Sequence, residues 1–262
     1  MFDLSSCHRL LQTGWLGRRF WYFQSLDSTN RFLHNMPAHR LSHGLVCLAD
    51  EQYDGSGQYG RQWNSAASEN LTFTIVLMPG EVQGIQLFSL AVMYGLKRTI
   101  DTMVSCDSQV KWPNDLYISG QKAAGVLTEC RYNGKKIDRM LLGLGVNVNQ
   151  TTFPDHLEGS ATSLARYTGG QPVDRTFFLA VLLNKLEPLL ERIDDGDLDL
   201  IREINRSIDG YGRWVSIEVD GKTEETPVKI LGVNEFGYLM VLTANDDLKI
   251  FTHEQVRFDV TK

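Results

Sequence analysis

The chain has 262 residues, a formal net charge of −6 and a hydrophobic fraction of 42%, values ordinary for a globular protein with one large core and room for a small second domain. This acidic balance argues against a broad nucleic-acid surface, and no apolar run approaches the roughly 18 to 20 residues that span a bilayer. The N-terminus lacks a basic stretch leading into an apolar one, so we expect a cytoplasmic protein that binds neither DNA nor membranes.

The four cysteines, Cys7, Cys47, Cys106 and Cys130, are far apart and form no CxxC pair of the kind that holds zinc or a redox disulfide. Free cysteine is among the most buried residue types. We therefore interpret all four as reduced core residues.

The larger part of the chain is predicted to mix helices and strands. Residues 27–36 are typical of a capped helix, and two strands follow at 44–51 and 71–78. Apolar positions at helical spacing over residues 84–103 predict a helix that is buried on one broad face.

Further strands are predicted at 110–112, 116–118, 124–130 and 140–148, and further helices at 174–193 and 198–208. Few long crossovers separate these strands, which favours a mixed, mainly antiparallel sheet packed with helices over a doubly wound one. The predicted fold class is therefore α+β.

Beyond Gly210 the pattern changes to short strands, at 214–219, 228–233, 238–242 and 248–252. Such spacing is typical of a small β-barrel. We predict a catalytic domain over residues 1–209 and a small C-terminal β-barrel domain over residues 210–262.

A glycine-rich loop occupies residues 54–63. Gly55, Gly57 and Gly60 permit positive φ and close approach of a ligand, and Arg61 offers a guanidinium to a phosphate or carboxylate. The loop lacks the GxxxxGK[ST] pattern of a P-loop, and a plain surface turn explains it equally well. The indole of Trp63 either covers a flat heterocycle such as adenine or packs in the core.

The string Lys-Trp-Pro-Asn-Asp at 111–115, followed by Lys-Ala-Ala-Gly at 122–125, is more informative. A given string of five residues arises by chance in a chain of this length only about once in ten thousand. Together the two segments resemble the KWPND and KxxG region of biotin protein ligases, enzymes that attach biotin to a lysine of a carrier domain.

Other segments follow in the order of that family: Asp-Ser-Thr-Asn at 27–30, Glu-Gln at 51–52, Gly-Leu-Gly-Val-Asn-Val at 143–148 and Ala-Thr-Ser-Leu at 161–164. The likeness extends from about residue 20 to about residue 260. It is to the form without an N-terminal helix-turn-helix, so no role in transcription is expected.

The resemblance implies a class II synthetase-like catalytic domain and a small SH3-like C-terminal barrel. In the family, biotin and ATP form biotinyl-5′-adenylate with the help of Mg²⁺, and a carrier lysine then attacks this mixed anhydride. The implied partner is a biotin carboxyl carrier protein, or the carrier domain of a biotin-dependent carboxylase. The resemblance implies a monomer or homodimer.

By the same resemblance, Lys122 touches both the biotin carboxylate and the α-phosphate, Asp115 orients or deprotonates the incoming lysine, and Arg61 contacts phosphate. The implied biotin-side residues are Ser28, Thr29, Gln52, Gly55, Lys122 and Gly125. The implied nucleotide-side residues are Gln58, Arg61, Trp63, Lys111, Asn114 and Asn147. The sequence offers no clear all-protein cage for Mg²⁺, so no metal ligand is assigned.

The glycine loop departs from the best-known version, GRGRxGR, because Ser56 and Gln58 stand at its first two arginine positions. In that version the second arginine helps to retain the adenylate. Gln58 still forms hydrogen bonds but supplies no charge. We hypothesise that this chain holds the intermediate less tightly than an arginine-bearing ligase does.

Two alternatives stay open at this point. A lipoate protein ligase or octanoyl transferase also modifies a carrier lysine, but such proteins lack Trp-Pro-Asn-Asp and carry a different glycine motif. A non-catalytic carrier-binding module is suggested only by Ser56 and Gln58, and the presence of Lys122 argues against it.

Overall fold

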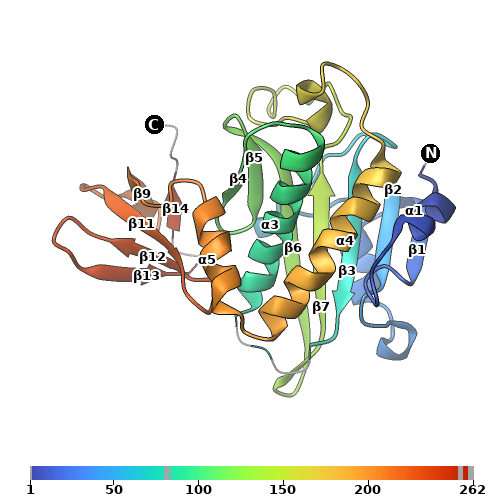
Figure 1. Cartoon of the computed structure of the whole chain (residues 1–262), viewed down its shortest axis with the longest axis horizontal. Helices are drawn as coiled ribbons and strands as arrows, with labels where there is room; N and C mark the ends of the chain where they lie inside the picture. The colour runs from blue at the N-terminus through green and yellow to red at the C-terminus, as the bar shows by residue number, and fades with distance from the viewer. Residues whose placement is uncertain (1, 80–81, 83, 253–255, 259–262) are drawn as a thin grey trace.

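The computed structural model describes residues 2–79, 82, 84–252 and 256–258. A seven-stranded sheet, in the order β1-β2-β3-β7-β6-β5-β4, forms its centre (Figure 1). β1 and β2 run parallel and the other neighbouring strands run antiparallel, which confirms the predicted mixed, mainly antiparallel sheet. The strands are β1 (Phe20–Leu26), β2 (Val46–Gln52), β3 (Leu71–Leu77), β4 (Ser108–Lys111), β5 (Asp115–Ile118), β6 (Gln121–Asn133) and β7 (Lys136–Val146).

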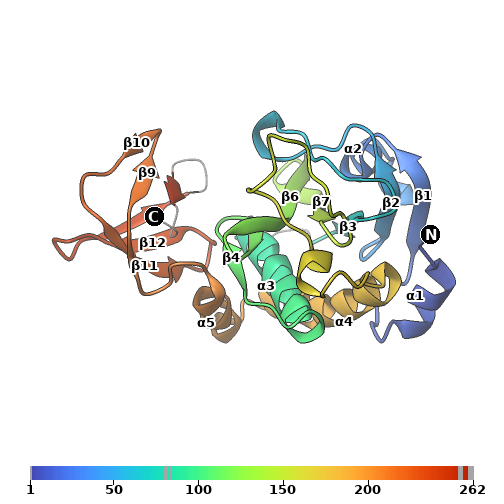
Figure 2. The same cartoon turned by 90° about the horizontal axis from the view of Figure 1, so that it is seen from above.

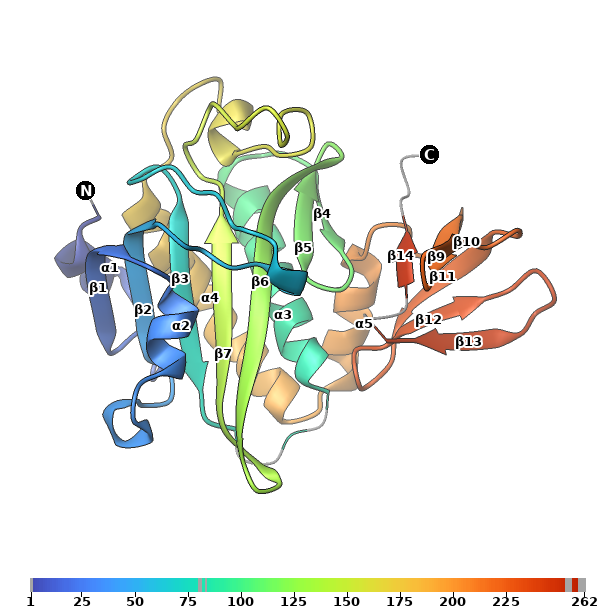
Figure 3. The same ribbon diagram turned by 180° about the vertical axis from the view of Figure 1, so that it is seen from behind.

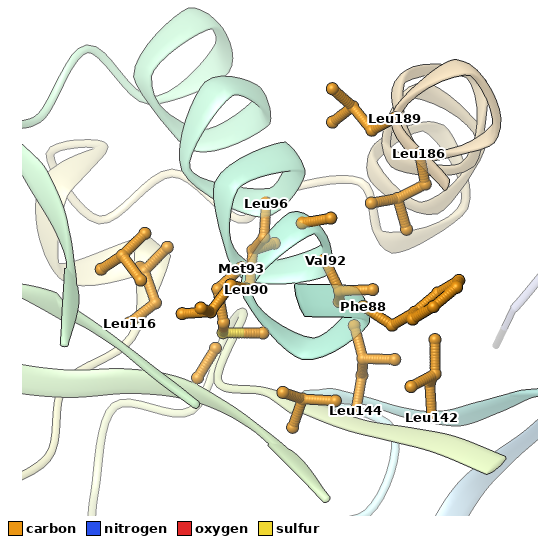
Figure 4. Packing of buried hydrophobic residues seen from close by; sticks show 14 of the residues in the cluster. Phe88, Leu90, Val92, Met93, Leu96, Leu116, Leu142, Leu144, Leu186 and Leu189 are labelled. Atoms are coloured by element: carbon orange, nitrogen blue, oxygen red, sulfur yellow. The ribbon is translucent and has the colours of Figure 1, made fainter. Parts of the chain in front are cut away.

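Two long helices, α3 (Ile85–Met103) and α4 (Arg175–Asp194), cover one face of this sheet, and the short α1 (Leu4–Leu10) lies beside α4 near the β1 edge (Figure 2). Phe88 and Val92 of α3 lie near Leu186 and Leu189 of α4 in the core (Figure 4). Gly95 lets the helices approach closely, because a Cβ there would lie 2.5 Å from a methyl group of Leu186. The predicted helices at 84–103 and 174–193 are confirmed.

The opposite face of the sheet carries α2 (Thr29–His34) and the glycine loop with its short 3-10 turn η2 (Gln58–Gly60), as Figure 3 shows. Ser28 caps α2, since its hydroxyl accepts a hydrogen bond from the backbone of Arg31. At the other end the guanidinium of Arg139, only 1% exposed, donates to the carbonyl oxygens of Leu33 at 3.1 Å and Met36 at 2.6 Å. The N-terminal end of α2 is thus capped, and its C-terminal end is fastened to β7 of the sheet.

The polypeptide before residue 27 was not predicted to contain elements, yet it forms α1 and β1. β1 begins with Phe-Trp-Tyr-Phe, and these side chains are partly buried on both faces of the sheet, so the period-two pattern of a strand is missing. Two further 3-10 turns, η1 (Ala38–Arg40) and η3 (Leu164–Tyr167), lie in connecting segments.

Helix α5 (Leu198–Ser207) leads into a smaller β unit made of two antiparallel sheets, in the orders β10-β9-β14 and β13-β12-β11-β8. The predicted strand at 214–219 is divided at Ser216 into two strands that belong to different sheets. The strands are β8 (Trp214–Val215), β9 (Ile217–Val219), β10 (Lys222–Thr223), β11 (Val228–Val233), β12 (Leu239–Leu242), β13 (Leu248–Phe251) and β14 (Val256–Phe258).

The apolar core runs without a break from the large sheet into this unit, where it includes Ile230, Val233 and Leu239. The division into domains at residues 209 and 210 therefore stays a prediction. No helix in the described ranges has the length and apolar character needed to cross a membrane.

The four cysteines are free, as expected, but they differ in burial. Cys7 and Cys47 are buried in the core, whereas Cys106 and Cys130 are only partly buried and pack against it. Cys106 follows the end of α3, and Cys130 lies towards the end of β6. The sequence alone does not show how far other elements cover such positions.

Candidate active site

A cavity of about 450 Å³ lies between the glycine loop, the start of α2 and strands β5, β6 and β7. It gathers residues that are far apart in the sequence, and all the residues assigned above except Gly55 line it. Gly55 is buried nearby, where a Cβ would lie 2.8 Å from the carbonyl oxygen of Trp63. The lining includes Ser28, Thr29, Gln52, Gln58, Arg61, Trp63, Lys111, Asn114, Asp115, Lys122, Gly125 and Asn147.

Lys122 lies near the start of β6 and forms an ion pair with Asp115 of β5, with 2.7 Å between Nζ and Oδ1. Its backbone is held on the other side, where its N–H donates to Ser160 O and its carbonyl accepts from Thr162 N, both at 2.9 Å. Gly125 makes room for the pair, because a Cβ there would lie 3.0 Å from Asp115 Oδ1 and 3.2 Å from Lys122 Nζ. The cation and the carboxylate are therefore placed by strand pairing.

A chain of hydrogen bonds fixes the polar end of the cavity beside α2. The backbone N–H and hydroxyl of Thr29 both donate to Oε1 of Gln52, at 2.7 and 3.0 Å, which leaves the amide N–H₂ of Gln52 as the group available to a ligand. Thr74 Oγ1 lies 2.8 Å from Thr29 Oγ1 and 2.6 Å from Asn30 Oδ1, and Asn30 Nδ2 donates to Glu129 at 2.7 Å. The polar side chains at this end are therefore held in fixed positions.

Sequence reasoning missed Asn30, which lines the cavity, and Thr74 and Glu129, which hydrogen-bond to the lining residues. Asn30 stands inside the Asp-Ser-Thr-Asn segment, so the motif itself carried the signal. Thr74 belongs to a strand of high β-propensity, where a threonine is as expected on a packed face as in a site. Only the fold brings it next to Thr29.

Trp63 and Asn147 mark another part of the cavity, and each has a buried polar atom without a hydrogen-bond partner among the described residues. The indole of Trp63 lies against β7, where a Cβ on Gly145 would be 2.2 Å from its Cε2. Asn147 Nδ2 donates to Thr162 O at 3.0 Å, so its unpartnered Oδ1 is an acceptor and the Trp63 Nε1 a donor. Buried polar groups of this kind indicate a polar ligand.

The Lys111–Asp115 segment joins β4 to β5 and borders the same cavity. Asn114 is fastened to β6, since its Nδ2 donates to Val126 O at 2.7 Å and its own carbonyl accepts from Val126 N at 2.9 Å. Lys111 Nζ lies 4.6 Å from the centre of the Tyr117 ring, a cation–π contact. This wall of the cavity is thus held by backbone and amide contacts.

The glycine loop folds back on itself as a hairpin. Gly57 N donates to Arg61 O at 2.7 Å, and Trp63 N donates to Gly55 O at 2.8 Å. All three loop glycines permit a positive φ, and Gly60 adopts one, of 71°. Gly55 is instead required by the close approach of Trp63.

Arg31 of α2, which sequence reasoning did not assign to the site, joins this hairpin to the helix. Its guanidinium lies 2.5 Å from Asp54 Oδ2 and 3.3 Å from Asp27 Oδ2, and it donates to Ser56 Oγ at 3.4 Å. The contact to Ser56 occurs at one of the two positions where the best-known loop carries arginine. The guanidinium of Arg31, which belongs to α2, therefore supplies a positive charge beside the loop.

Comparisons with known proteins agree with this arrangement. A model described as the biotin/lipoate A/B protein ligase family matches residues 22–147. The bifunctional ligase/repressor BirA of Bacillus subtilis is 27% identical over 247 residues, covering 92% of this chain and 75% of that protein. The biotin–[acetyl-CoA-carboxylase] ligase of Paracoccus denitrificans is 33% identical over 165 residues, covering 60% of this chain and 66% of that protein.

A solved structure of the biotin protein ligase from Aquifex aeolicus in complex with biotin and ATP superposes with a TM-score of 0.80 at 26% identity, covering 92% of this chain and all of that one. Fold and site together define a catalytic unit of the biotin/lipoate ligase type. The chain belongs to the biotin protein ligase family. It is a ligase enzyme, so the alternative of a non-catalytic module is wrong.

Proposed function

We propose that this protein activates biotin with ATP as biotinyl-5′-adenylate and transfers biotin to a lysine of a biotin carboxyl carrier domain. The observation that carries the proposal is the Lys122–Asp115 ion pair, set in a cavity that also contains a rigid polar end and the unpartnered groups of Trp63 and Asn147. The names of the relatives, which include ligases of biotin and a complex with biotin and ATP, support the choice of substrates.

The first step brings two anions together. A biotin carboxylate approaching an α-phosphate at about 4 Å is opposed by about 4 kcal/mol per pair of unit charges at an effective dielectric of about 20. The ammonium of Lys122 offsets that repulsion and stabilises the charge on the oxygens in the transition state. The carboxylate oxygen then bonds to phosphorus, and pyrophosphate leaves.

The second step needs a neutral amine. With a pKa of about 10.4, only about one lysine side chain in 2,500 is neutral at pH 7. Asp115 accepts the proton of the carrier lysine, the amine attacks the acyl carbon, and AMP leaves with the electrons of the broken acyl–oxygen bond. Asp115 and Lys122 act in successive steps from one ion pair.

The polar end beside α2 suits the ureido ring of biotin. Because Gln52 Oε1 already accepts two hydrogen bonds from Thr29, the amide N–H₂ of Gln52 is fixed as a donor for the ureido carbonyl. Ser28 lines the same end of the cavity. The unpartnered groups of Trp63 and Asn147 suit the adenylate, which offers both donors and acceptors.

Mg²⁺ is expected with ATP, because the ion neutralises part of the triphosphate charge. No group of three or more His, Cys, Asp or Glu side chains within the described ranges is placed to hold a metal ion. We therefore assign the ion no protein ligand and expect it to be bound mainly by phosphate oxygens and water, as is usual for Mg²⁺ at nucleotide sites.

The test is an assay of the purified protein with ATP, Mg²⁺, biotin and an apo carrier domain, read by mass spectrometry. We expect a mass increase corresponding to biotin, none when lipoate or octanoate replaces biotin, and none with Lys122→Ala. Labelling by lipoate instead of biotin would contradict the proposed substrate. Labelling that survives Lys122→Ala would contradict the proposed role of that residue.

A further inference from the structure

A turn of the smaller β unit contacts the wall of the cavity at a buried position. The indole Nε1 of Trp112, which is only 4% exposed, donates a hydrogen bond of 3.0 Å to the carbonyl oxygen of Gly237. Trp112 stands between Lys111 and Asn114 in the segment that lines the cavity, whereas Gly237 lies in the turn that joins β11 to β12.

This turn is itself rigid. Asn234 Oδ1 accepts hydrogen bonds from Phe236 N and Tyr238 N, both at 3.0 Å, and Gly237 adopts a positive φ of 81°. A substitution at Gly237 would therefore displace the whole turn, because the N–H groups of Phe236 and Tyr238 on either side of it are already hydrogen-bonded to Asn234.

The turn is also wedged against the start of α3. A Cβ on Gly237 would lie 2.6 Å from Cβ of Gln86, and a Cβ on Gly84 would lie 2.7 Å from Glu235 O. No real Cβ fits at such distances without a shift of one backbone relative to the other. The turn thus fills a space between α3 and Trp112 that admits little displacement.

The strand that leads into the turn is anchored as well. Asn205 of α5 pairs with the backbone of Val233, donating to its carbonyl at 3.0 Å and accepting from its N–H at 2.7 Å. A Cβ on Gly232 would lie 2.4 Å from the side chain of Asn205. The turn packs against α3, and the strand before it is hydrogen-bonded to α5. These two contacts define the position of the turn relative to the larger unit.

From these contacts we infer that the β11–β12 turn is a positioning element of the nucleotide side of the site: it supports Trp112 from behind and so sets the place of Asn114 and Asp115. The inference rests on the proposed nucleotide site. It assigns the smaller β unit a part in ATP binding without a direct contact to the ligand. Trp112 and Gly237 are positioning residues.

The test uses two glycines of the intact 262-residue chain that share a positive φ. Gly237→Ala introduces a Cβ 2.6 Å from Gln86, whereas Gly221→Ala, at φ 79° in the β9–β10 turn, introduces one with nothing within 4 Å. Both substitutions carry the same cost of a positive φ, so their difference isolates the displacement of the turn.

We expect Gly237→Ala to raise the Kd and KM for ATP about tenfold and to leave the KM for biotin within about twofold, the size of effect that follows from loss of one buried hydrogen bond. Gly221→Ala should leave all three unchanged. Amide hydrogen exchange should accelerate over residues 112–118 in Gly237→Ala alone. Equal ATP affinities for the two variants, or a parallel rise in both KM values, would overturn the inference.

If Gly237→Ala does not fold, Trp112→Phe carries the same test, since it keeps an aromatic ring while it removes the N–H donor together with part of the indole volume. It should show the same selective loss of ATP affinity. Because nucleotide binding and hydrogen exchange are measured without biotin or carrier, they separate the two proposals. A wild-type protein that binds ATP but transfers no biotin would contradict the proposed function and leave this inference standing.

Discussion

Lys122 Nζ and Asp115 Oδ1 lie 2.7 Å apart on neighbouring antiparallel strands, so the cation and the carboxylate that we assign to two successive steps form one ion pair. In the proposed mechanism, Lys122 turns to the two anions of the first step, and Asp115 then loses its partner and becomes available as a proton acceptor. The first step would thereby prepare the second.

This exchange of partners predicts that the two steps respond differently to Asp115→Asn. Adenylate formation, measured as biotin-dependent exchange of pyrophosphate into ATP, should stay within about threefold because Lys122 is retained. Transfer to the carrier should fall at least about a hundredfold, the size expected for loss of a general base. Lys122→Ala should instead lower exchange by a factor of about 10² to 10³. An equal loss of both steps in Asp115→Asn would contradict the scheme.

Gly145→Ala is predicted to weaken nucleotide binding. Its Cβ would lie 2.2 Å from Cε2 of Trp63, so the indole has to leave its place against β7. We expect the KM for ATP to rise about tenfold, since a well-packed aromatic contact is lost. Gly14→Ala is the control, because its Cβ would meet only Glu187 at an ordinary 3.6 Å. An unchanged KM in Gly145→Ala would show that Trp63 is not part of the nucleotide site.

Gln58→Arg tests the hypothesis that the altered glycine loop holds the adenylate loosely. A charged hydrogen bond to the phosphate should slow release of the intermediate by about tenfold and reduce stray labelling of other lysines in proportion. Single-turnover trapping of released adenylate measures the first, and mass spectrometry of a bystander protein the second. If neither changes, the departure from the arginine-bearing loop has no effect on retention.

Arg31→Gln should loosen the glycine hairpin without disturbing the rest of the fold. The ion pairs of Arg31 with Asp54 and Asp27 are largely exposed, so we expect a modest effect, about three- to fivefold faster release of adenylate. Hydrogen exchange over residues 55–62 should rise in parallel. Arg202→Gln removes an equally short but distant ion pair with Asp199, 2.5 Å long, and should change neither quantity. Equal adenylate release and hydrogen exchange in the two variants would show that Arg31 does not hold the glycine hairpin.

Cys47 should resist alkylation in the folded protein. Burial raises the pKa of its thiol to about 12, from an ordinary value of 9.0, so very little thiolate exists at pH 8. The same shift means that its contribution to the free energy of unfolding is fully present below about pH 9 and is lost as the pH rises towards 12. Iodoacetamide at pH 8 should label Cys47 only after denaturation. Rapid labelling of the native protein would contradict the buried position.

The amino-acid sequence by itself determined the class of fold and supplied the candidate residues of the site. Helical spacing over 84–103 and the short apolar runs from 110 to 148 predicted the helix-covered, mainly antiparallel sheet, because these periodicities are local properties of the chain. The strings at 111–115 and 122–125 likewise pointed to Asp115 and Lys122, because the residues of such motifs are consecutive in the sequence.

Only the tertiary structure decided which distant groups meet. Thr74 becomes part of the polar end because β3 lies beside α2, and Arg31 reaches Ser56 because the loop folds back over the helix. The bond from Trp112 to Gly237 joins positions 125 residues apart. Contacts of this kind arise from packing between elements, and no periodicity or motif within either segment encodes them. The same holds for the ion pair of Lys122 and Asp115: the sequence supplied both residues, and the β5–β6 register set them 2.7 Å apart.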